Sequence, residues 1–277
     1  MSELVMLSES GGVATITFNR PEKLNAFGID MGEQLIDAVD RVAQSHTARV
    51  LVVTGAGRAF SAGGDLGFMA ALKERGARYE GLRPLVDAGR VAVLKLASLP
   101  FPTIAAVNGP AAGGSVNFAL ACDLRIASDR ATFGQTFVRI GLHADWSGTY
   151  FLPRLVGLSR ALELCWLGDM IGADEALRIG LVNRVVSHER LAEEVQAIAA
   201  RLASSPQTTV RLVKQNLIAS SQRTLEQCLE AEDAAQEACW NSPDSGEGIR
   251  AFAGKRKAAF GAVHEPAAAT AARAQFE

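Results

Sequence analysis

Residues 103 to 115 read TIAAVNGPAAGGS, and this stretch decides the fold class. Thr103 to Val107 is a short apolar run, which is typical of a buried strand. The run ends at the turn residues Asn108, Gly109 and Pro110, and residues of helical character follow from 114 to 121. A strand followed by a glycine loop and a helix is the basic unit of an α/β protein.

Two further patterns extend this prediction toward the N-terminus. Arg49 to Thr54 is another apolar run that ends at glycine, and helical residues follow from 66 to 72. Val13 to Phe18 alternates between its two faces after a Gly-Gly pair, which indicates the second strand of a hairpin. Repeated strands, turns and helices predict an α/β fold for this part of the chain.

Strand patterns stop near Ser187, and the rest of the chain is mainly helical. We predict helices over residues 188 to 204, 207 to 221, 224 to 240 and 246 to 260. The organisation that follows is an α/β core over 1–203, a helical oligomerisation region over 204–261, and a flexible tail over 262–277. The apolar faces of the helical region need a partner to cover them.

The composition excludes several classes of protein. The 277 residues are 48% hydrophobic, which excludes a disordered chain, and 28 basic and 30 acidic residues leave a net charge of -2. Mixed charge of this kind gives no field for nucleic acid, and no apolar run is long enough for a membrane span. The four cysteines show no C-x-x-C spacing, so we expect reduced thiols, no metal and a cytoplasmic protein.

Two loops could carry chemistry. Phe60 to Leu66 reads FSAGGDL, Asn108 to Ser115 reads NGPAAGGS, and each runs into a predicted helix. Because the first backbone N–H groups of a helix lack partners, one amide from each loop could form an oxyanion hole if the loops converge. The alternative is that both are only tight turns. A dinucleotide fingerprint is not supported, since Phe60 occupies its third glycine position.

Taken together and in this order, the motifs resemble the crotonase superfamily, also called the enoyl-CoA hydratase/isomerase family. The resemblance covers nearly the whole chain and implies a spiral of ββα units with a C-terminal helical trimerisation region. It also implies an acyl-CoA substrate, with no separate cofactor because coenzyme A is part of that substrate, and a homotrimer or dimer of trimers. The matching segments are NRP at 19–21, LNA at 24–26, FSAGGDL at 60–66, AVNGPAAGG at 106–114, ACDLRIA at 121–127, FGQ at 133–135 and GLV at 180–182.

The same resemblance implies the residues of the site. Gly64 and Gly114 match the glycines whose amides hold the thioester oxygen. The positions that match the family's CoA contacts are Lys23, Leu24, Ala26, Ser61, Ala62, Asp65 and Leu66, and, toward a neighbouring subunit, Phe252 and Lys255. A solvated basic helix end is the alternative for Lys255.

The residue that performs acid-base chemistry is predicted to be Asp145. Family hydratases use two glutamates, whose matching positions here are Asn117 and Phe137. Neither side chain can accept a proton near neutral pH. The stretch GLHADWSGT at 141–149 resembles the aspartate motif of the family's isomerases, which implies that Asp145 is the catalytic acid and base. The alternative is that Asp145 caps a helix beginning at Trp146.

These residues favour an isomerase of unsaturated acyl-CoA thioesters. One carboxylate suffices to remove a proton and return it two carbons away, and we expect Phe137, Val138, Leu142 and Trp146 to shield it from water. A hydratase that uses Asp145 with Asn117 remains the second hypothesis. A catalytically silent acyl-CoA-binding protein is the third.

Overall fold

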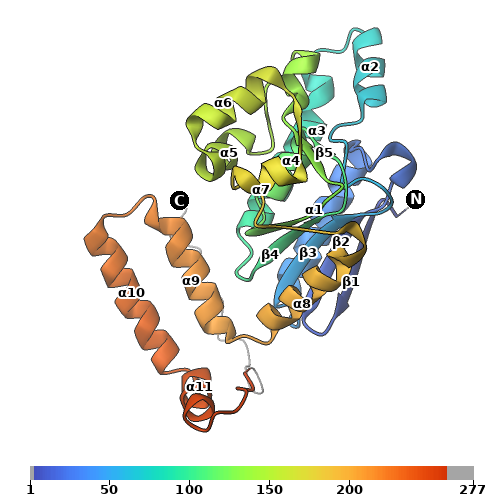
Figure 1. The fold of residues 1–277 in the computed structure, drawn as a ribbon. Coiled ribbons are helices and arrows are strands. Elements are labelled where there is room, and N and C mark those ends of the chain that lie inside the picture. Colours follow the sequence, from blue (N-terminus) through green and yellow to red (C-terminus); the bar gives the residue numbers. More distant parts are fainter. Residues whose placement is uncertain (1–2, 261–277) are drawn as a thin grey trace. The chain divides into compact units, whose positions relative to one another are not determined.

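The computed structural model describes residues 3–260, which fall into two compact units (Figure 1). The first unit ends at Ala200 and the second begins at Arg201, three residues before the predicted boundary and within the last turn of α8 (Leu191–Ala203). The tail predicted over 262–277 lies outside the described residues.

The first unit is built on two sheets. The larger has the strand order β1-β2-β3-β4-β6-β9, in which β1 pairs antiparallel with β2 and the remaining neighbours are parallel. The smaller has the order β5-β7-β8. The larger sheet contains β1 (Val5–Ser10), β2 (Val13–Phe18), β3 (Val50–Gly55), β4 (Thr103–Val107), β6 (Leu124–Ser128) and β9 (Arg184–Val186). The smaller contains β5 (Ala111–Ala112), β7 (Thr132–Gly134) and β8 (Met170–Gly172).

Helices follow the strands as the sequence patterns predict. In addition to α8, the first unit contains α1 (Ile29–Gln44), α2 (Leu66–Glu74), α3 (Tyr79–Ala97), α4 (Gly114–Leu120), α5 (Gly148–Val156), α6 (Leu158–Leu167) and α7 (Ala173–Arg178). Three short 3₁₀ turns cover Pro21–Lys23, Thr136–Ile140 and His188–Arg190. The predicted hairpin, the strand over 103–107 and the helices after both glycine loops are confirmed.

The core contains buried residues of the large sheet, α1, α3 and α4. Phe18 of β2 is fully buried, and its ring lies 5.0 Å from that of Phe27, 5.3 Å from that of Phe60 and 6.0 Å from that of Phe118. Burying a side chain of this size stabilises a fold by roughly 1.5–3 kcal/mol. Because Phe60 begins one glycine loop and Phe118 follows the other, this cluster anchors both loops to the sheet.

The second unit contains α9 (Gln207–Ser220), α10 (Leu225–Trp240) and α11 (Pro243–Ala253). A capping box between Thr224 and Gln227 starts α10. The prediction of a last helix over 246–260 is wrong at both ends, because α11 begins at Pro243 and is followed by Gly254. Proline suits the first position of a helix, where its missing N–H has no partner to lose. Among residues 3–260, no helix is long and apolar enough to span a bilayer.

Candidate active site

The two glycine loops are bonded to each other. The Ala112 N–H donates to the Ser61 carbonyl over 3.0 Å, and the Ser115 hydroxyl donates to the same oxygen over 2.6 Å. Gly63 has a φ of +86°, and a Cβ placed on it would lie 2.6 Å from the Ala112 oxygen, so only glycine fits there. The loops, 50 residues apart in the sequence, therefore converge as the oxyanion-hole hypothesis requires.

Gly64 and Gly114 line one cavity of about 290 Å³. Gly114 is the first residue of α4, and Gly64 directly precedes Asp65, the N-cap of α2. No backbone or side-chain oxygen in residues 3–260 accepts a hydrogen bond from either N–H. Both amides are therefore available to an oxygen that develops negative charge in the cavity.

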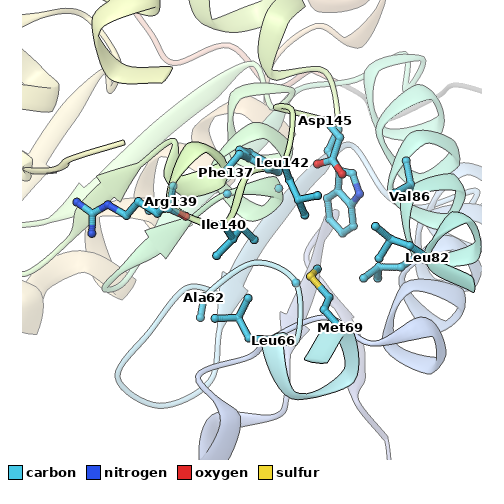
Figure 2. A pocket seen from close by; sticks show the side chains of 16 residues that line it. Ala62, Leu66, Met69, Leu82, Val86, Phe137, Arg139, Ile140, Leu142 and Asp145 are labelled. Carbon is cyan, nitrogen blue, oxygen red and sulfur yellow. The ribbon is translucent and has the colours of Figure 1, made fainter. Parts of the chain in front are cut away.

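The cavity walls are mainly apolar (Figure 2). Met69 points into the cavity from α2, and its methyl group would lie 2.3 Å from a Cβ placed on Gly64. The apolar side chains in the wall come from Leu66, Met69, Leu82, Leu85, Val86, Phe137, Ile140, Leu142 and Trp146. The predicted wall residue Val138 is not among them, because it is 45% exposed on the far side of the 3₁₀ turn that carries Phe137.

Asp145 is the one carboxyl in this wall among the described residues. Burial raises its pKa to about 6, and this rise is opposed by its own backbone N–H and by the nearby His143. The alternative that Asp145 caps a helix is wrong. Ser147 is the N-cap of α5, and the Asp145 backbone carbonyl, not its carboxylate, accepts from the Gly148 N–H over 3.1 Å.

Trp146 connects Asp145 to the rest of the site. Its φ of 48° is rare for a residue with a side chain, and the indole is nearly fully buried. A Cβ placed on Gly89 of α3 would lie 1.7 Å from the indole, and one on Gly114 would lie 3.1 Å from it. The indole also packs edge-on against the Phe27 ring, with centroids 5.1 Å apart. These contacts with α3, a glycine loop and Phe27 hold Trp146, the residue next to Asp145, in place.

The two positions that match the hydratase glutamates have different surroundings. Phe137 lines the cavity, and its ring lies 3.7 Å from a Cβ placed on Gly113. Asn117 is fully buried behind the cavity, where its side chain bonds to the Asp145 backbone and to Gln135. Sequence reasoning quoted Gln135 only within the FGQ motif at 133–135 and gave it no role, although a polar residue directly after a strand was a signal that could have found it.

The predicted CoA contacts divide into three groups. Ala62 and Leu66 line the cavity, and the Ala62 N–H donates to Leu24 over 2.9 Å, which places the turn over Lys23, Leu24 and Ala26 beside the loop.

Ser61 and Asp65 instead make internal bonds. The Ser61 hydroxyl is buried and donates to the Asn25 carbonyl over 2.8 Å, while Asp65 pairs with Arg20 at 2.8 Å. Phe252 and Lys255 belong to the second unit, where Phe252 is 88% exposed, and their roles stay predictions.

A cavity with two unpaired peptide amides and one carboxyl with a raised pKa suits proton transfer at carbon beside a thioester carbonyl. Within residues 3–260, no three His, Cys, Asp or Glu side chains are grouped so that they could hold a metal ion. Fold and site together are typical of an enzyme that acts on acyl thioesters.

The chain belongs to the enoyl-CoA hydratase/isomerase family, whose model matches residues 8–263. Crotonyl-CoA hydratase of Syntrophomonas wolfei is 39% identical over 259 residues, which cover 93% of this chain and 98% of the relative. The 1,2-epoxyphenylacetyl-CoA isomerase of Escherichia coli is 38% identical over 267 residues, 94% of this chain and 99% of the relative.

A solved structure agrees with these matches. The enoyl-CoA hydratase from Bacillus anthracis aligns with a TM-score of 0.85 at 35% identity, over 92% of this chain and 98% of its own. The predicted crotonase-type α/β fold with a C-terminal helical region is therefore confirmed.

Proposed function

We propose that this protein is an isomerase of unsaturated acyl-CoA thioesters, with Asp145 as both base and acid. The observation that carries the proposal is a cavity that, in the described part of the chain, holds one carboxyl together with the unpaired amides of Gly64 and Gly114. Coenzyme A enters as part of the substrate, and we expect it along the turn over 23–26 and beside Ala62 and Leu66.

In the proposed reaction the thioester oxygen accepts hydrogen bonds from Gly64 and Gly114. Each such donor stabilises the developing enolate by roughly 2.7–4 kcal/mol. Asp145 removes a proton from the carbon α to the thioester and returns it to the γ carbon, which moves the double bond. A pKa near 6 leaves the carboxyl ionised at neutral pH while making its conjugate acid a useful proton donor.

The apolar walls support isomerisation over hydration. Hydration needs an activated water and a second proton donor, but Phe137 offers neither, and both ends of the Asn117 amide are already hydrogen-bonded away from the cavity. The hydratase relative and the isomerase relative are nearly equally identical to this chain, so overall identity does not favour either activity. The proposal therefore rests on the site.

A panel of acyl-CoA thioesters in D₂O tests it. An isomerase exchanges α and γ protons for deuterium and shifts the double bond of 3-enoyl-CoA, with loss of both in Asp145→Asn. A hydratase removes the conjugated absorbance of crotonyl-CoA and yields a 3-hydroxyacyl product. Tight thioester binding without any exchange would identify a silent binding protein, and either of the last two results would refute the proposal.

A further inference from the structure

Two buried amide side chains lie behind the cavity instead of in its wall. Asn117 on α4 is fully buried, and Gln135, which follows β7, is only 2% exposed. Neither lines the cavity that contains Asp145. Because a buried amide is costly unless it is hydrogen-bonded, the partners of these two residues indicate what they do.

The hydrogen bonds of Asn117 fix which way its side-chain amide points. Asn117 Nδ2 donates to the backbone oxygen of Asp145 over 2.7 Å, and Asn117 Oδ1 accepts from Gln135 Nε2 over 2.6 Å. A carbonyl can only accept, so Asn117 must present its nitrogen to Asp145 and its oxygen to Gln135. Gln135 Oε1 has no partner within residues 3–260, and the bond to Asn117 is therefore what this side chain contributes.

The segment that Asn117 holds has an unfavourable backbone. Trp146 and Ser147 have φ values of 48° and 70°, a left-handed conformation that residues with side chains seldom adopt. Such a conformation persists only where the surroundings impose it. Asn117 holds the carbonyl just before this segment, and a Cβ placed on Gly148 would lie 2.3 Å from Asn117 Nδ2, so the segment rests directly on the amide.

We propose that Asn117, oriented by Gln135, is a positioning residue that fixes the Asp145 carboxyl relative to the amide of Gly114. This inference rests on the proposed function, since it concerns the same carboxyl. Gly114 and Asn117 lie on one short helix, α4, which therefore places the oxyanion donor and the support of the base in one rigid frame.

Two substitutions that remove hydrogen-bonding groups without adding charge test the inference. Asn117→Leu removes the donor to the Asp145 carbonyl, and Gln135→Met removes only the bond that orients Asn117. The control is Asn183→Leu, because Asn183 also bonds to a backbone group, accepting from the Arg125 N–H over 2.8 Å, but lies outside the cavity wall. We expect kcat for proton exchange to fall roughly 10- to 100-fold in both variants with KM within about twofold of wild type. The control should keep the wild-type kcat.

The titration of Asp145 supplies a readout that general destabilisation would not move. ¹³C-carboxyl NMR, assigned with Asp145→Asn, should give a wild-type pKa of about 6. The ionisable neighbours are His143 on the same segment and Arg139 in the wall, whose guanidinium pairs with Asp169 at 3.1 Å. Releasing the segment should expose the carboxyl, so that its pKa and the midpoint of the rate profile both fall toward the ordinary value for aspartate.

The outcomes separate this inference from the proposed function. A wild-type protein that exchanges no proton in any thioester would refute the proposed function, while the NMR titration would still test the positioning. Folded variants with unchanged kcat and an unchanged Asp145 pKa would overturn the inference. If Asn117→Leu does not fold, Gln135→Met decides, and failure of both to fold would assign the pair a purely structural role and also overturn it.

Discussion

Asp65 lies in a glycine loop beside the cavity and Asp145 in the cavity wall, and their surroundings shift the pKa values of these two partly buried carboxyls in opposite directions. Although burial alone would raise the pKa of Asp65, the Phe68 amide and the Arg20 guanidinium hold it below its usual range. Among residues 3–260, no cation forms an ion pair with the Asp145 carboxylate, and burial raises its pKa to about 6. Asp65 caps a helix, whereas Asp145 does not.

This difference separates a structural carboxylate from a reactive one. A carboxylate that is already bonded to a guanidinium and to helix amides is a poor base, because taking a proton would break those bonds. A carboxylate in an apolar wall gains from accepting a proton, which suits it to repeated transfer. The comparison predicts that equivalent substitutions at the two positions will have opposite consequences.

The largest expected effect is on proton exchange. Asp145→Asn removes the base and should lower kcat by roughly 10²- to 10⁴-fold, the usual contribution of general acid-base catalysis. Asp65→Asn keeps an oxygen that can cap α2, so exchange should stay within about tenfold of wild type. Exchange is followed by mass spectrometry in D₂O, with thioester binding measured by calorimetry to show that both variants still bind. Equal losses at the two positions would break the comparison.

The second prediction concerns stability against pH. The pKa of Asp145 in the folded protein is above its unfolded value of 3.8, so the folded state binds more protons and stability falls as pH rises from about 4 to 6. Asp145→Asn is free of this penalty and should exceed wild type by up to about 3 kcal/mol above pH 7, with the difference vanishing below pH 4. Urea unfolding at several pH values measures it. A variant that is less stable than wild type at pH 7 would contradict the assigned environment.

A third prediction compares two glycines, one beside each carboxyl. A methyl group on Gly89 would overlap the Trp146 indole, and we expect Gly89→Ala to destabilise the fold by roughly 1–3 kcal/mol and to lower exchange. Gly67 lies in α2, where a Cβ would be 3.2 Å from the Asp65 carboxylate, a contact that a small shift can relieve. Gly67→Ala should therefore change stability by less than about 1 kcal/mol. Thermal melts of the two variants side by side provide the measurement, and equal melting temperatures would argue against the indole as the support of Asp145.

The smallest expected effect is the loss of the Arg20 ion pair. Asp65→Asn should lower the free energy of unfolding by about 1 kcal/mol at neutral pH. The ion pair is partly buried, and Arg20 can still donate a hydrogen bond to the one side-chain oxygen of the asparagine. Since the pKa of Asp65 is lowered on folding, this stability is present above the unfolded value and is lost as pH falls through the folded one. Unfolding curves of the variant and of wild type should therefore converge at low pH. A difference that persists there would assign the effect to the helix cap.

Local patterns in the sequence predicted much of the fold. The alternation over Val13 to Phe18 and the apolar run over Thr103 to Val107 are formed by neighbouring residues, and both gave the observed strands. The last helix was predicted to begin at residue 246, although proline is favoured at the start of a helix and Pro243 begins it. The order of motifs supplied the family, which local patterns alone could not.

The site was less predictable because its geometry depends on distant contacts. The sequence leaves two roles open for Asp145, and the left-handed backbone of Trp146 and Ser147 decides against the helix cap. This backbone conformation depends on the hydrogen bond that Asn117 donates to Asp145, 28 residues away, and on the space that Gly89 leaves for the Trp146 indole. No spacing rule connects these residues, so only the folded chain shows that they act on one carboxyl.

A 3-enoyl-CoA that carries deuterium on its α carbon tests the central claim most directly, with the position of the label in the 2-enoyl product read by NMR. If one carboxyl both takes and returns the proton, a fraction of the deuterium should appear at the γ carbon with wild type, in competition with exchange into solvent, and none with Asp145→Asn. Transfer of the label by Asp145→Asn at the wild-type rate would contradict the account.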